Sequence, residues 1–183
     1  MKVEDHTQGI GAIITNLAAL ETVLRYFMSR VKRENPEFPK PGDRQAKKNY
    51  LTRNIALQNL IRNYNGVLRS TESAYSVDKR GMVRVRNAFA HGRILTTTEI
   101  PARLWNFIGS DKKGYMDIEF DEEMNDDWLK RTSLKIDVEK QKVVDCFKAR
   151  GYTSACGNLD RGLNFMLHQV VPYRCLSNNT QHH

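Results

Sequence analysis

The sequence predicts a mainly α-helical protein, an antiparallel helical bundle with a small β-hairpin inserted after its third helix. Two observations lead to this fold class. Apolar residues recur every three or four positions through most of the chain, and two short strand-like segments follow residue 103. The 183 residues are enough for one domain with its own core. We therefore expect a single domain over residues 1–176 and a loose tail over residues 177–183.

Three helices are predicted in the first half of the chain. The first covers residues 10–31 and stops before the proline-rich stretch 35–42. The second is expected over about 44–70 and the third over about 77–91, with Gly92 as the C-terminal stop of the third. Long helices with short connections favour antiparallel packing. The predicted apolar face of the first helix comprises Ile10, Ile13, Ile14, Leu17, Leu20, Leu24, Phe27 and Val31.

A hairpin is predicted at about 103–120, directly after the third helix. Residues 104–108 and 115–120 are rich in aromatic and β-branched side chains, and the segment 109–114 between them begins and ends with glycine. The two segments therefore favour a pair of short antiparallel strands.

A fourth helix is predicted to begin near Asp126 or Asp127, either of which could cap it, and to end near Gly151. The acidic stretch 121–127 could indicate a cation site, but it has no matching second cluster, and we interpret it as a strand-to-helix turn. A weaker fifth helix is expected over about 158–170. The expected apolar contacts of the fourth helix are Trp128, Leu129, Leu134, Ile136, Val143, Val144 and Phe147.

The basic residues are concentrated in the first half of the chain. The net charge is +8, and residues 1–94 hold 17 Lys and Arg against 8 Asp and Glu, whereas residues 95–183 hold 12 against 13. A positive field attracts polyanions, above all nucleic acid, with an acidic protein or an anionic membrane as alternatives. A basic surface that serves only solubility would give the same composition.

Several features favour a cytoplasmic protein. The three cysteines, Cys146, Cys156 and Cys175, match no zinc-binding spacing and suit free thiols in a reducing compartment. The N-terminus lacks the pattern of a secretion signal. Polar and charged residues interrupt the apolar stretch 10–31, so we expect no membrane span.

The end of the third predicted helix carries the motif that is most informative about function. Arg86 is followed by Asn87 and, after three further small or apolar residues, by His91; Gly92 and Arg93 come next. An Arg and a His at this spacing are weak evidence alone, because Arg86 could be a surface charge and His91 a helix-terminal residue favoured by the helix dipole. The complete string at the end of a helix is more specific.

This string resembles the signature of the HEPN superfamily, whose nuclease members carry Arg, four to six residues and then His, often with Asn directly after the Arg. The resemblance covers roughly residues 8–150. It implies a helical endoribonuclease that leaves 2′,3′-cyclic phosphate and 5′-hydroxyl ends, and many members are toxins or phage-defence effectors. One toxin branch, paired with a nucleotidyltransferase antitoxin, has Tyr two residues after the His. Arg93 stands there in this chain, which disfavours that pairing.

The residue types suit metal-independent RNA cleavage. His91 can accept or donate a proton near neutral pH, and Arg86 offers a charged planar group that matches phosphate oxygens. Arg86 and His91 lie about 140° apart around a regular helix, whereas Asn87 and His91 share a face, so we expect Asn87 to orient the imidazole. Since one helix makes an incomplete site, we expect a homodimer that joins two copies along the motif helix.

Arg84 and Arg93 are further candidates for contacts with RNA phosphates, and we expect no metal and no cofactor. Two other functions fit the same residues. The chain could be a catalytically inactive HEPN module that binds RNA or a partner as a dimeric scaffold. It could instead be an antitoxin or regulatory subunit that recognises an acidic protein.

Overall fold

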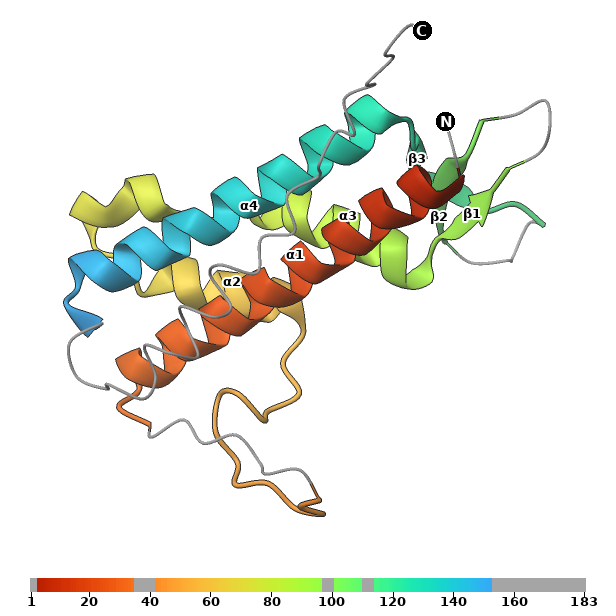
Figure 1. The fold of residues 1–183 in the computed structure, drawn as a ribbon. Coiled ribbons are helices and arrows are strands. Elements are labelled where there is room, and N and C mark those ends of the chain that lie inside the picture. The colour runs from red at the N-terminus through yellow and green to blue at the C-terminus, as the bar shows by residue number, and fades with distance from the viewer. Residues whose placement is uncertain (1–2, 35–41, 97–100, 110–113, 153–183) are drawn as a thin grey trace, which may run out of the picture.

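Two long helices, α1 (Val3–Val31) and α4 (Asp126–Ala149), lie side by side and form the framework of the molecule (Figure 1). The computed structural model describes residues 3–34, 42–96, 101–109 and 114–152. The framework helices run in the same direction. The His6 ring nitrogen Nε2 lies 2.9 Å from the Met124 carbonyl oxygen, and Asn16 Nδ2 donates to Ser133 Oγ at 2.9 Å, so both helices advance together.

Helix α2 (Leu57–Gly66) is much shorter than the predicted helix over residues 44–70. The cause is Arg25 of α1, whose guanidinium donates to the backbone carbonyl oxygens of Tyr50, Arg53 and Ile55 at distances between 2.7 and 3.0 Å. Within a helix those carbonyl oxygens would accept from backbone amides instead. The apolar spacing of this segment thus reflects packing of an irregular connection against α1.

The predicted antiparallel order of the first two helices is wrong. Leu57 at the start of α2 lies beside the middle of α1, whereas Tyr64 near its end packs against Phe27 in the last third of α1, with ring centroids 4.8 Å apart. The helices α1 and α2 therefore run in the same direction (Figure 1). A short 3₁₀ helix, η1 (Ser70–Tyr75), follows α2.

Helix α3 (Lys79–His91) is the predicted motif helix, and it runs opposite to α4. Asp78 at its start pairs with Lys135 at 3.0 Å, whereas Phe89 near its end lies 6.2 Å from the Trp128 ring. Asp78 also caps the helix by accepting a hydrogen bond from the Gly81 amide at 2.9 Å.

Gly92 ends α3 as predicted, but for a different physical reason. Its backbone is extended, with φ at −75°, so no left-handed conformation requires glycine here. A Cβ at this position would instead overlap the carbonyl oxygens of Ala88 and Trp105. Gly92 therefore allows the end of α3 to approach the sheet closely.

A three-stranded antiparallel sheet follows α3, in the order β1 (Arg93–Leu95), β2 (Arg103–Ile108) and β3 (Asp117–Glu123). Strands β2 and β3 confirm the predicted pair, although the centre of the predicted turn, residues 110–113, lies outside the described residues. Strand β1 was not predicted, because three residues directly after a helix carry no alternating pattern.

Helix α4 begins at Asp126, within the acidic stretch 121–127 that was predicted to form the strand-to-helix turn. Its cap is Asn125, whose side chain accepts from the Trp128 amide at 2.9 Å, so neither Asp126 nor Asp127 is the capping residue. The predicted contact of Leu134 with the core is wrong, because Leu134 is 64 % exposed. The predicted fifth helix over 158–170, the tail and two cysteines lie outside the described residues, whereas Cys146 is a buried free thiol.

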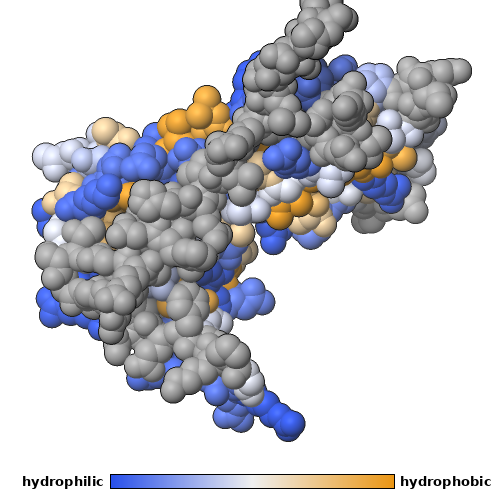
Figure 2. Space-filling view, viewed as in Figure 1, coloured by the Kyte–Doolittle hydropathy of each residue, from blue (hydrophilic) through white to orange (hydrophobic). Residues whose placement is uncertain are grey.

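The core lies between α1, α2 and α4, where Phe27, Leu60, Tyr64 and Val143 are fully buried. Residues His6–Val31 of α1 are long and apolar enough to cross a membrane, but half of that stretch is buried inside the structure, and core helices meet the same criterion. On the face shown in Figure 2, the described hydrophobic side chains form small separate groups among hydrophilic ones.

Candidate functional site

The Arg86, Asn87 and His91 side chains meet at the exposed end of α3. Arg86 Nη1 lies 3.4 Å from His91 Nε2 and donates to Asn87 Oδ1 at 3.4 Å. His91 is exposed, and Arg86 is half-buried. Although Arg86 and His91 project from different sides of the helix, the long arginine side chain therefore reaches the imidazole.

The contact between Arg86 and His91 suits one tautomer of the imidazole. A guanidinium only donates hydrogen bonds, so Arg86 can donate to His91 Nε2 in the tautomer that carries its proton on Nδ1. Within the described residues, Asn87 does not make the expected hydrogen bond to His91. Its side-chain oxygen accepts from Arg86 instead. Both contacts of Arg86 are longer than typical hydrogen bonds and leave the guanidinium weakly held.

One face of α3 carries a row of polar side chains that leads to His91. Arg80, Arg84, Asn87 and His91 fall within about 60° of one another around the helix axis. Arg84 is held in place, because it donates to the Glu119 carbonyl oxygen at 3.0 Å and its guanidinium lies 5.0 Å from the Phe120 ring centroid. The spacing of this row was visible in the sequence, although only Arg84, Asn87 and His91 were selected from it.

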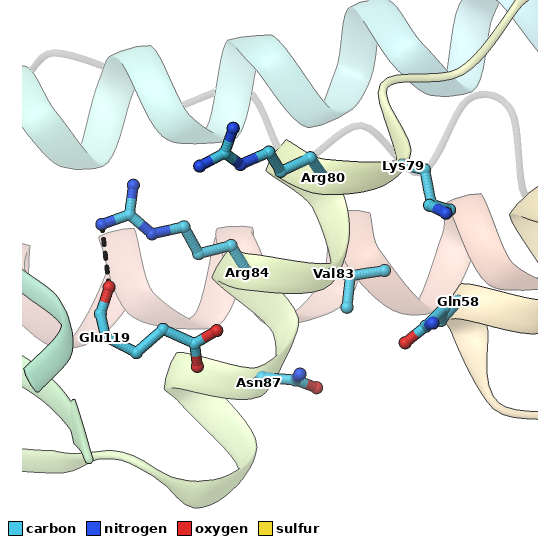
Figure 3. Close-up of a pocket in the computed structure, with 7 residues that line it drawn as sticks. All are labelled: Gln58, Lys79, Arg80, Val83, Arg84, Asn87 and Glu119. Atoms are coloured by element: carbon cyan, nitrogen blue, oxygen red, sulfur yellow. Dashed lines mark hydrogen bonds between the residues drawn. The ribbon is translucent and has the colours of Figure 1, made fainter. Parts of the chain in front are cut away.

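A cleft of about 500 Å³ runs along the same face of α3 (Figure 3). Arg80 and Arg84 extend in the same direction from the helix, the Glu119 carboxylate lies between Arg84 and Asn87, and Gln58 of α2 faces the opposite side (Figure 3). The cleft is lined by Gln58, Lys79, Arg80, Val83, Arg84, Asn87 and Glu119. Three cations and one carboxylate give it a net positive charge, which suits a polyanion.

Arg93, the other predicted phosphate contact, points elsewhere. Its guanidinium lies 5.7 Å from the Phe107 ring centroid, and Phe107 packs 6.4 Å from Trp105 on the same side of the sheet. The structure thus places Arg84 in the cleft and Arg93 on an aromatic surface of the sheet.

On the other side of Arg86, an apolar groove of about 240 Å³ separates α3 from α1. Ile14, which was predicted to belong to the core, is 51 % exposed in this groove. The groove is lined by Ile14, Leu17, Ala18, Glu21, Leu57, Arg86, Phe89 and Ala90. The motif therefore lies on a ridge between a basic cleft and an apolar groove.

The largest pKa shifts occur at the opposite end of the bundle. Hydrogen bonds from the Arg150 side chain and the Arg69 amide lower the pKa of Glu72 to about 2. Burial raises the pKa values of Tyr64 and Cys146 beside this pair. These groups are enclosed by the core, and we interpret them as structural.

Within the described ranges, no group of three or more His, Cys, Asp and Glu side chains is arranged to hold a metal ion. Comparison of the chain with protein-family models, with curated proteins and with solved structures gives no match. The assignment of function therefore depends on the geometry of α3 and its surroundings.

Proposed function

We propose that this protein is a HEPN-type endoribonuclease that cleaves RNA without a metal ion, as a homodimer. The main support is the contact between Arg86 and His91, 3.4 Å apart at the exposed end of a helix whose adjacent face lines a basic cleft. A phosphate-binding group and a proton-transfer group thus lie together where an RNA strand can reach both.

The chemistry follows from these two groups. An arriving phosphate is a stronger acceptor than an imidazole, so Arg86 would turn to the phosphate oxygens and release His91 Nε2. The free Nε2 would then take the proton of the 2′-hydroxyl. The 2′-oxygen attacks phosphorus, the bond from phosphorus to the 5′-oxygen breaks, and that oxygen gains a proton. The products are a 2′,3′-cyclic phosphate and a 5′-hydroxyl.

A second copy of the chain would supply the group that protonates the leaving oxygen. The apolar groove borders Arg86, and its exposed Ile14 is a surface that a second copy could cover. Two-fold packing through this groove would bring both α3 helices, each with Arg86 and His91, to one shared site.

Cleavage of tRNA and mRNA by the purified protein in EDTA tests the catalytic proposal. Arg86→Ala and His91→Ala should each lower the rate at least about a hundredfold. Arg131→Ala is the matched control, because Arg131 is an exposed cation of α4 outside the cleft. If the wild type is inert but binds RNA, the inactive scaffold becomes the better description. If the three variants cleave equally well, the proposed site is wrong.

The mass of the protein in solution tests the dimer. Ile14→Arg should give monomers and abolish cleavage, because it places a charge in the apolar groove. Leu134→Arg changes an even more exposed apolar residue, on α4, and should leave the dimer intact. A dimer that survives Ile14→Arg would place the interface elsewhere.

In the cell, we propose a cytoplasmic toxin or phage-defence effector, held in check by a partner protein such as an antitoxin. Induced expression should then stop growth, and His91→Ala should remove this effect. Growth arrest by both proteins alike would argue against a toxic nuclease.

A further inference from the structure

Strand β3, at one edge of the sheet, contains a bulge that faces the cleft. Asn106 pairs with Phe120 and Phe107 pairs with Ile118, so Glu119 is an extra residue in β3 without a partner in β2. A bulge residue departs from the alternation of the strand and can be directed to a site. Here the Glu119 carboxylate lies in the cleft beside Asn87 (Figure 3).

The Glu119 carboxylate is held by a neutral donor. Asn106, which is buried, donates from Nδ2 to Glu119 Oε2 at 2.9 Å, and this bond fixes the orientation of the carboxylate. Oε1 has no hydrogen bond within the part of the chain that the structure describes. The nearby Arg84 contacts only the backbone carbonyl of Glu119, so the described residues give the carboxylate no ion pair.

An oriented carboxylate among cations is unsuited to phosphate but suited to the edge of a nucleobase. Carboxylates only accept hydrogen bonds, and they repel phosphate oxygens. Lys79, Arg80 and Arg84 can bind the backbone, whereas Glu119 can bind amino and imino groups of a base. Single-stranded RNA is read by such contacts to base edges.

We propose that the cleft selects a guanosine of single-stranded RNA through Glu119. Guanine presents two adjacent donors, its ring N1–H and its exocyclic amino group, which match the two oxygens of a carboxylate. Uracil presents one N–H between two carbonyl oxygens, which the carboxylate repels. This inference rests on the proposed function and adds the base that the RNA site recognises.

The order of residues along α3 places the selected base near the cut. Asn87, beside Glu119, precedes His91 by four residues, which is about 6 Å or one helical turn. Successive nucleotides of an extended strand are separated by a similar step. The cleaved bond should therefore lie beside the selected guanosine.

The test measures binding separately from cleavage. His91→Ala protein is titrated with labelled oligouridylate and with the same oligonucleotide carrying one central guanosine, and fluorescence anisotropy gives each Kd. The guanosine should tighten binding about tenfold. In the His91→Ala background, Glu119→Gln should abolish this preference, because an amide presents a donor to the base. Since Glu119 is exposed, the substitution should not impair folding.

Glu122→Gln is the control, because it removes the same charge from the same strand outside the cleft, and the preference should persist. Equal Kd values for both oligonucleotides, or a preference that survives Glu119→Gln, would overturn the proposal. A protein that selects guanosine without cleaving RNA would refute the proposed catalysis and leave this inference standing. A protein that cleaves RNA but binds both oligonucleotides equally would support the proposed catalysis and refute the selection of guanosine.

Discussion

Two arginines at opposite ends of the bundle, Arg150 and Arg86, differ in almost every respect. Arg150 has a side chain only 8 % exposed, donates to Glu72 at 2.5 Å and to the Val67 carbonyl oxygen at 2.8 Å, and lies 5.0 Å from the Phe27 ring centroid. Arg86 is half-buried, and both of its described polar contacts measure 3.4 Å.

The difference separates an arginine that holds the fold from one that is free to act. A buried charge must be fully paired, and once paired it cannot bind anything else without a large loss of stability. An arginine with long, weak contacts can exchange them for a phosphate at little cost. The largest pKa shifts therefore occur at the Arg150 end, whereas the proposed chemistry belongs to the Arg86 end.

The largest effect is expected from Arg150→Ala. The substitution leaves the Glu72 carboxylate buried without its partner, which should lower the free energy of unfolding by about 3–5 kcal/mol. Denaturant unfolding measures this loss. Arg86→Ala is the matched substitution and should change stability by less than about 0.5 kcal/mol. Equal losses in the two variants would remove the distinction between the arginines.

Arg86→Lys tests whether the proposed catalysis needs the guanidinium group of Arg86 or only its charge. Lysine keeps the charge but loses the planar fork that binds two phosphate oxygens, so cleavage should fall about tenfold to a hundredfold with unchanged stability. Single-turnover rates on one RNA measure the loss. Arg80→Lys, a change in the cleft away from the reacting groups, should have a much smaller effect. A fully active Arg86→Lys enzyme would show that Arg86 acts only through its charge.

Acid should destabilise the protein through the ion pair of Arg150 with Glu72. The pKa of Glu72 is lowered from 4.5 to about 2, so its stabilising effect is complete above about pH 5 and is lost as the pH falls toward 2. The free energy of unfolding should fall by about 3 kcal/mol over this range through Glu72. Glu72→Gln should be less stable at neutral pH and less sensitive to acid, whereas Glu122→Gln, a change in strand β3 outside this ion pair, should follow the wild type. Identical acid profiles for Glu72→Gln and the wild type would contradict the assignment.

The smallest effect concerns the junction between α3 and the sheet. Gly92→Ala places a methyl group against the Ala88 and Trp105 carbonyl oxygens and should cost about 1–2 kcal/mol. Gly11→Ala is the control, since a Cβ there meets no atom within 4 Å, and it should stabilise α1 by up to about 1 kcal/mol. If Gly92→Ala were also stabilising, the close approach of the end of α3 to the sheet at Gly92 would not require glycine.

The sequence predicted the elements whose pattern is local. The helix ending at His91, the strand pair β2 and β3, and the turn before α4 follow from periodicity, capping residues and glycine positions. The length of α2 could not be predicted, because it depends on hydrogen bonds from Arg25, which lies 25 to 30 residues away in the chain. The parallel course of α1 and α2 depends on the same connection.

The candidate site was predicted in part for the same reason. Arg86, Asn87 and His91 are close in sequence, so their proximity followed from one helix. The contact of Arg86 with His91 was not expected from backbone angles alone, because a long side chain can reach around the end of a helix. Glu119 could not be selected, since its position depends on a bulge that no local pattern in β3 indicates.

The end groups of RNA cut by the purified protein in EDTA test the central claim most directly. If Arg86 and His91 carry out the proposed reaction, the wild type should leave 2′,3′-cyclic phosphates and 5′-hydroxyls, and His91→Ala should leave none above background. Products with 3′-hydroxyls and 5′-phosphates, or the same cyclic phosphates from His91→Ala at an undiminished rate, would contradict the account.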